Sequence, residues 1–147
     1  MRFGTAGASP PPPLVVGVLC TGFGGAAGAV ARWSLTSGFP VEADRFPWTT
    51  FLINVVGSGL LAALPLIGAV HRQPWLALLL GTGVLGGFTT MSAASVETFV
   101  LFDNGHPAVA LSYCLGTLAA ALLAVVATDR LTTPDQRRDV ERLEGDL

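Results

Sequence analysis

Charge is scarce in this sequence. Only 12% of its 147 residues are Asp, Glu, Lys or Arg, lysine is absent, and the formal net charge is −2. A nucleic-acid surface needs positive charge clustered on one face, so the composition predicts no nucleic-acid partner. A soluble domain of this size could not hide a composition that is 51% hydrophobic inside one core. Most of the surface is therefore expected to face lipid.

The chain also has few of the side chains that build metal centres, disulfides and catalytic groups. Its two cysteines, Cys20 and Cys114, fall within apolar stretches and lack metal-ligand spacing, which argues against a disulfide framework and a zinc site. Its two histidines, His71 and His106, fall in short predicted loops, without the serine and acid that would complete a nucleophilic triad. The sequence therefore predicts that the protein is not an enzyme.

Most of the charge that is present lies near the C-terminus. Six of the ten acidic residues and four of the eight arginines lie at or after Asp129. At the other end, four consecutive prolines close residues 1–13 and favour the extended polyproline form. We therefore predict a disordered, Pro-rich lead-in (residues 1–13), a four-helix transmembrane domain (residues 14–128) and a polar cytoplasmic tail (residues 129–147).

The middle of the chain consists of long apolar runs. The first extends from Leu14 to about residue 35, and about 20 residues at 1.5 Å each cross a hydrocarbon core of about 30 Å. The other three begin at prolines, which cost no hydrogen bond in a first helical turn. They are expected at residues 47–70, with a kink at Pro65, and at residues 74–102 and 107–128. The sequence thus predicts an all-α membrane protein with four spans and both termini on one side.

The first run has an alternative interpretation as a secretory signal peptide. Ala29-Val30-Ala31 is an A-x-A-like cleavage site that follows a short apolar region. Three further runs follow it, so the chain stays in the membrane under either interpretation.

Arginine placement predicts the orientation. Arg2, Arg72, Arg130 and the arginines of the tail lie on the side of the termini, whereas Arg45 and Arg32 lie toward the other side. Cytoplasmic loops of membrane proteins carry an excess of Lys and Arg. Both termini are therefore expected in the cytoplasm, with the protein in the cell membrane.

The third run is too rich in glycine at its centre for one regular helix. Residues 81–90 read GTGVLGGFTT, and adjacent glycines followed by adjacent β-branched threonines are poor helix formers. Broken backbone at membrane depth is tolerated only where protein or a cavity satisfies it, so a break here is a predicted site. The G-x-G-x-x-G within it lacks the strand and acidic residue of a dinucleotide site.

Several polar residues within the spans have two open interpretations. Asn54 either bonds helix to helix or lines a pore, where an amide N–H can replace water around a small anion. Met91, Ala94, Ser95 and Thr98 share one helical face, as do Tyr113 and Thr117, and these faces serve either packing or a polar track. Gly24 and Gly28 form a G-x-x-x-G motif that is expected to serve helix packing. Glu97 lies close to the end of its predicted span, where an interfacial position or a salt bridge to Arg32 is expected in preference to a buried proton carrier.

Three stretches in order along the chain resemble the signature blocks of the fluoride channel family (Fluc, also called CrcB). They are GAVARW at residues 28–33, NVVGS at 54–58 and GGFTTMS at 86–92. The resemblance implies an antiparallel dimer with two narrow pores at the subunit interface. It also implies a structural sodium ion, which is not transported and is held by backbone carbonyls at positions that match Gly86 and Thr89.

The resemblance assigns pore-lining roles to Asn54, Tyr113 and Thr117. The family's two pore phenylalanines fall on Met91 and Ala94, so neither ring is present here. Aromatic edges carry the positive part of the ring quadrupole and can face an anion, so their loss should weaken anion stabilisation, although Met91 keeps bulk and polarizability. A homodimer of this chain would lack every one of these rings.

These residues lead to a hypothesis about the partner subunit and to two competing functions. The missing rings and the arginine bias suggest one half of a heterodimer, in which an oppositely inserted paralogue supplies the phenylalanines. One competing function is a small multidrug exporter, which needs a buried acid in its first helix, and the first run contains none. The other is a non-conducting accessory subunit.

Overall fold

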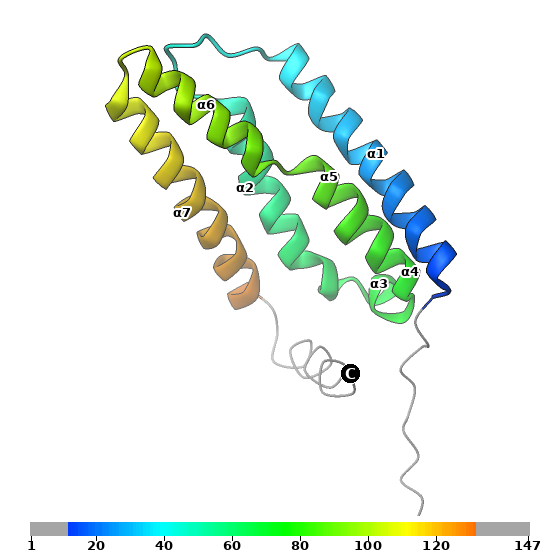
Figure 1. Ribbon diagram of the computed structural model, residues 1–147. Coiled ribbons are helices and arrows are strands. Elements are labelled where there is room, and N and C mark those ends of the chain that lie inside the picture. Colours follow the sequence, from blue (N-terminus) through cyan, green and yellow to red (C-terminus); the bar gives the residue numbers. More distant parts are fainter. Residues whose placement is uncertain (1–11, 132–147) are drawn as a thin grey trace, which may run out of the picture.

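The fold is a bundle of long helices, shown in Figure 1 by a computed structural model that describes residues 12–131. Within these residues the regular structure is helical, without strands. Four segments are long and apolar enough to cross a bilayer, namely residues 14–38, 48–66, 74–103 and 107–130. The predicted all-α membrane protein with four spans is confirmed. Residues 12 and 131 lie at the same end of the bundle (Figure 1).

The first and fourth spans are single helices, α1 (Leu14–Gly38) and α7 (Pro107–Leu131). Both run about three residues beyond the ends expected from the apolar runs. The predicted lead-in and tail lie mainly outside the described residues.

The second span ends earlier than predicted. Helix α2 (Trp48–Ala63) passes into a 3₁₀ turn, η1 (Leu64–Leu66), which contains Pro65, and a short helix α3 (Gly68–Arg72) follows. Proline has no N–H for the helical ladder, so the α-helix stops before it. The expected end near residue 70 and the expected connection confined to residues 71–73 are therefore wrong.

The third span is interrupted at two residues only. Helix α4 (Pro74–Ala77) continues into the π-helical η2 (Leu78–Leu85) and helix α5 (Gly86–Phe88), and helix α6 (Met91–Asp103) completes the span. Thr89 and Thr90 between them have extended backbone, with ψ of 155° and 110°. The predicted break is present, but the glycines before it stay helical.

Close backbone contacts hold α1 against the first half of the third span. Gly24 and Gly28 are buried, and a Cβ at either position would meet a backbone carbonyl, that of Leu79 or Val84. Without a hydrophobic driving force between helices in lipid, small residues allow this approach. The packing role expected for the two glycines is confirmed.

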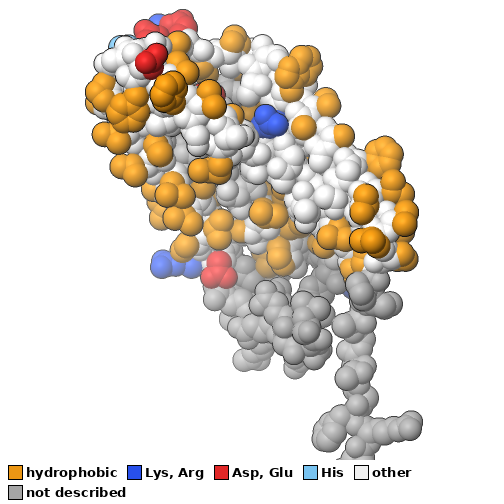
Figure 2. All heavy atoms as spheres, in the orientation of Figure 1, with side chains coloured by type: hydrophobic (Ala, Val, Ile, Leu, Met, Phe, Trp, Pro, Cys, Tyr) orange, Lys and Arg blue, Asp and Glu red, His pale blue; other side chains and the backbone are white. Residues whose placement is uncertain are grey.

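The break joins two groups of helices. Helix α1 packs mainly on η2 and α5, whereas α2 and α6 pack mainly on α7. The chain crosses from one group to the other at Thr89 and Thr90, visible as the extended link between α5 and α6 in Figure 1. Hydrophobic side chains cover much of the visible outer surface in Figure 2, and most charge gathers at the two ends. The protein is a multi-pass membrane protein whose irregular backbone lies between two packed groups.

Candidate functional site

The side chain of Asn54 completes the backbone at the break. Asn54 lies on α2 and is only 4% exposed. Its Nδ2 donates to the Thr90 carbonyl at 3.0 Å, and its Oδ1 accepts from the Thr90 amide at 2.8 Å. An unpaired backbone group at membrane depth costs several kcal/mol, so this two-point contact stabilises the extended backbone. The expectation of a bond between helices is confirmed, and a pore-lining role for Asn54 stays a prediction.

Asn54 and the Thr90 hydroxyl together release two carbonyls from the helical ladder. In a continuous helix the Thr90 amide would bond to the Gly86 carbonyl, and the Ala93 amide would bond to the Thr89 carbonyl. The Thr90 amide bonds to Asn54 instead, and the Ala93 amide donates to the Thr90 hydroxyl at 3.1 Å, which caps α6. Unwound carbonyls of this kind are suitable ligands for a sodium ion. The donor chemistry at Gly86 and Thr89 therefore fits the predicted cation.

Arg32 reaches the break from α1. Its Nε donates to the Gly87 carbonyl at 3.3 Å, and the side chain is half-buried. The predicted ion pair between Arg32 and Glu97 is wrong, because Glu97 is bonded to two hydroxyls on other helices. Arg32 thus contacts the half of the third span that precedes the break, and Asn54 contacts the residue that ends it.

Two hydroxyl groups converge on the Glu97 carboxylate. Thr50 of α2 donates to Oε1 at 2.7 Å, and Tyr113 of α7 donates to Oε2 at 2.5 Å. Thr50 and Tyr113 are fully buried, and Glu97 is partly buried. A carboxylate in a spanning helix is costly unless it is hydrogen-bonded, so the three side chains link α2, α6 and α7.

One pattern in the sequence indicates part of this triad of Thr50, Glu97 and Tyr113. Thr50 and Asn54 are four residues apart and share a face of α2, and Glu97 is the one acid well inside a span. A buried acid needs a donor, and Thr50 was a candidate donor on the face of Asn54.

Replacing Tyr113 with phenylalanine should lower the free energy of unfolding by about 1–3 kcal/mol, because Glu97 Oε2 loses its donor inside the bundle. Ser112→Ala is a matched control, since this exposed hydroxyl bonds only within its own helix, to the Val109 carbonyl. Chemical unfolding in detergent micelles measures both variants. Equal losses in the two would contradict a linking role for the triad.

Tyr113 and Thr117 face the interior of the subunit. Tyr113 packs in a cluster with Ala94, Leu101 and Ala110. Its ring packs edge-on against that of Phe46, with the two ring centroids 5.3 Å apart. The Thr117 hydroxyl donates to the Tyr113 carbonyl at 2.7 Å and is 2% exposed. Their pore-lining role stays a prediction. Within one subunit, both residues serve packing.

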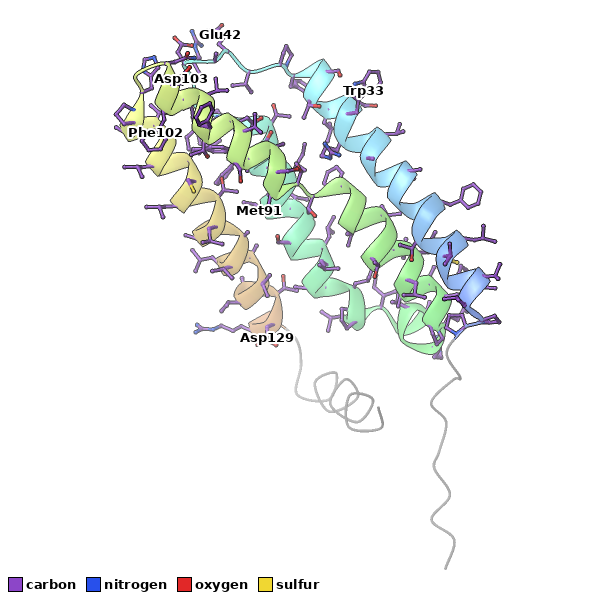
Figure 3. All side chains as sticks on the ribbon, in the orientation of Figure 1. Trp33, Glu42, Met91, Phe102, Asp103 and Asp129 are labelled. Carbon is purple, nitrogen blue, oxygen red and sulfur yellow. The ribbon has the colours of Figure 1, made fainter. Side chains whose placement is uncertain are left out.

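Met91 and Ala94 differ sharply in their surroundings. Met91 is 62% exposed at the start of α6, where Figure 3 labels it beside the break, whereas Ala94 is 6% exposed and packs against the Tyr113 cluster. Residues three apart on a helix lie on neighbouring but not identical lines. The expected common face is therefore divided: Met91 points out of the subunit, and Ala94 points into it.

A cavity of about 230 Å³ lies beside the triad, at the end of the bundle opposite residues 12 and 131. Thr50 and Glu97 line it from within, and Glu42 and Arg45 line it from the loop after α1. The residues described here contain no group of three His, Cys, Asp or Glu side chains that could hold a metal ion.

Comparisons with known proteins identify the family of this chain. Residues 19–128 match the family model described as CrcB-like protein, Camphor Resistance (CrcB). The fluoride-specific ion channel FluC 2 of Streptomyces avermitilis is 40% identical over 107 residues, which cover 69% of this chain and 65% of that relative. FluC 1 of Mycobacterium bovis is 41% identical over 110 residues, covering 69% and 79%, and FluC of Erythrobacter litoralis is 40% identical over 124 residues, covering 78% and 90%. The chain belongs to the CrcB-like family.

Proposed function

We propose that this chain is a subunit of a fluoride-selective passive ion channel that lowers cytoplasmic fluoride by export. One observation carries the proposal. In a chain whose relatives are named fluoride-specific channels, Asn54 holds open the break of the third span through the Thr90 amide and carbonyl. Irregular backbone in a membrane is retained where protein satisfies it, where it lines a cavity or where it binds an ion, and we propose that this break lies next to the permeation path.

Neutral polar groups suit the passage of a small anion. Asn54, Tyr113 and Thr117 offer an amide and two hydroxyls without a positive charge that would trap the ion. The second N–H of the Asn54 amide is available beyond the bond to Thr90. We propose that these three residues, with Met91 and Ala94, line the pore in the assembled channel.

A sodium ion is the cofactor that we propose for the break. The carbonyls of Gly86 and Thr89 would hold it, since both are released from the helical ladder. When bound, the cation supplies a fixed positive charge beside an anion path and is not itself transported. The chain's own contribution is to keep these carbonyls unpaired, through Asn54 and the Thr90 hydroxyl.

If the protein lies in the cell membrane, fluoride export needs no coupled energy source such as ATP or a proton gradient. An inside-negative potential drives anions outward, at about 2.3 kcal/mol per charge per 100 mV. In the described chain, Arg72 and Arg130 lie at the end shared by residues 12 and 131, which favours cytoplasmic termini.

We further propose that the functional unit is an antiparallel dimer, and that a paralogous subunit supplies the aromatic rings that positions 91 and 94 lack. The arginine bias supports this, because it favours one fixed orientation whereas an antiparallel homodimer needs both. Tagged termini in cells would locate each copy. A near-equal split between the two sides of the membrane would contradict the heterodimer.

Fluoride efflux from sodium-loaded liposomes tests the channel. Full-length protein is reconstituted alone, and chloride efflux is recorded in parallel. Fast fluoride release with chloride retained would establish a self-sufficient channel. If this chain alone releases no fluoride, liposomes that contain both this chain and the paralogue should release it. If their release rate equals that of liposomes with the paralogue alone, this chain is a non-conducting accessory subunit.

A further inference from the structure

Among the arginines between residues 12 and 131, Arg32 is the one that lies inside a span and not at its end or in a connection. It follows Gly28 by one turn of α1, on the side that packs closely against α5. A charged side chain at this depth is costly, so its partners define its role.

The hydrogen bond of Arg32 removes one carbonyl from the break. Gly87 lies between the two candidate cation ligands, Gly86 and Thr89, and its carbonyl accepts from Arg32 Nε at 3.3 Å. Its usual helical partner would be the Met91 amide, which lies beyond the break. Two side chains from different helices thus bind the backbone around the break. Asn54 on α2 binds the Thr90 amide and carbonyl, and Arg32 on α1 binds the Gly87 carbonyl.

The charge of Arg32 is not neutralised within the subunit. Between residues 12 and 131 the ion pair at Arg45 and Glu42 is exposed at the loop, and none is found at Arg32. The Glu97 carboxylate accepts hydrogen bonds from Thr50 and Tyr113 and forms no ion pair with Arg32. A guanidinium on the Gly87 carbonyl therefore places a positive charge beside the neighbouring carbonyls, where repulsion is stronger than in water.

We propose that Arg32 is a positioning residue of the cation site: it holds the Gly87 carbonyl away from the ion and sets, by its charge, how tightly Gly86 and Thr89 bind it. This rests on the proposed sodium site. The arrangement keeps a net positive charge at the break, from the arginine and the cation together, on the side of α1.

Sodium dependence of thermal unfolding tests the proposal on the full-length chain in detergent. The unfolding midpoint is recorded against sodium concentration at constant ionic strength, with N-methylglucamine as the replacement cation. Ligand binding to the folded state stabilises it by RT ln(1 + [L]/Kd), so the midpoint begins to rise once sodium exceeds its Kd, and the sodium concentration at this onset measures the affinity. Arg32→Gln keeps a donor for the Gly87 carbonyl and removes the charge. It should lower that concentration about tenfold.

Two further variants separate positioning from packing. Arg32→Lys keeps the charge, so the sodium concentration at which its unfolding midpoint begins to rise should stay within about threefold of the wild type, even if the unfolding temperature itself falls. Arg45→Gln, which changes an exposed loop arginine, should leave the sodium curve unchanged. Equal loss of unfolding temperature in the two Arg32 variants, with unchanged sodium curves, would overturn the proposal.

The remaining outcomes also decide. If Arg32→Gln does not fold, Arg32→Lys decides alone, because a tenfold shift with the charge retained would overturn the role of the charge. If sodium fails to stabilise the wild type, the cation site and this inference both fall. Fluoride release from liposomes would then judge the channel separately.

Discussion

Replacing Asn54 with leucine is expected to slow fluoride release from sodium-loaded liposomes by about a hundredfold or more. The variant leaves the Thr90 amide and carbonyl without partners at membrane depth. Each unsatisfied buried group costs about 1–3 kcal/mol, so the break loses about 2–6 kcal/mol of stabilisation. A tenfold change in rate corresponds to about 1.4 kcal/mol. If part of the stabilisation lost by the extended backbone at Thr90 raises the barrier to permeation, the expected effect follows.

A fluoride electrode measures the release, with chloride recorded beside it. Asn104→Leu is the matched control, because Asn104 is exposed and its side chain makes one hydrogen bond, which it donates to the Ala43 carbonyl at 3.2 Å. Its release rate should equal that of the wild type. If this chain does not conduct alone, the same pair of variants is compared in the presence of the paralogue. Unchanged flux in Asn54→Leu would favour a passive scaffold.

The second large effect concerns the missing rings. Met91→Phe should raise fluoride release by this chain alone about fivefold to tenfold, because an aromatic edge is worth about 0.5–1.5 kcal/mol in a favourable contact. Position 91 is 62% exposed and can take a ring without displacing a neighbour. Ala94→Phe should instead lower the free energy of unfolding by about 1–3 kcal/mol, since its ring must enter the cluster around Tyr113.

Val96→Phe is the control for this experiment. It lies on the same helix and is as exposed as Met91, at 62%, but it does not occupy a position where the family carries a ring. Release rates and unfolding curves are measured for all three variants. If Met91→Phe and Val96→Phe release fluoride at the same rate as the wild type, the absence of a ring does not limit conduction, and the heterodimer hypothesis loses its main support.

Membership in the CrcB-like family also decides between the competing functions. The curated relatives are named fluoride-specific ion channels, which confirms the prediction that the chain is not an enzyme. A small multidrug exporter is excluded by the same finding, as the absence of an acid in the first span had indicated. A non-conducting accessory subunit stays a prediction, because Met91 and Ala94 replace the two pore phenylalanines of the family. The flux experiment distinguishes such a subunit from a pore.

The glycines and threonines of the third span show how far local signals reach. Residues 81–90 predicted an interruption, and the structure has one, but only Thr89 and Thr90 leave the helix. Gly83 and Gly87 remain helical because they pack against the backbone of Cys20, Gly24 and Gly25 on α1. Helix propensity favoured a break anywhere in this stretch. The packing partner, which is distant in sequence, determined where it occurred.

The sequence by itself determined the membrane class, the four spans and their starting residues, because apolar length and proline are local properties. It also determined that the third span is irregular and that Asn54 needs a partner. Only the tertiary structure decided that this partner is the backbone of Thr90, that Glu97 bonds to Thr50 and Tyr113, and that Ala94 is buried while Met91 is exposed. Such pairings depend on how helices far apart in the chain are rotated against one another, and no local pattern fixes that rotation.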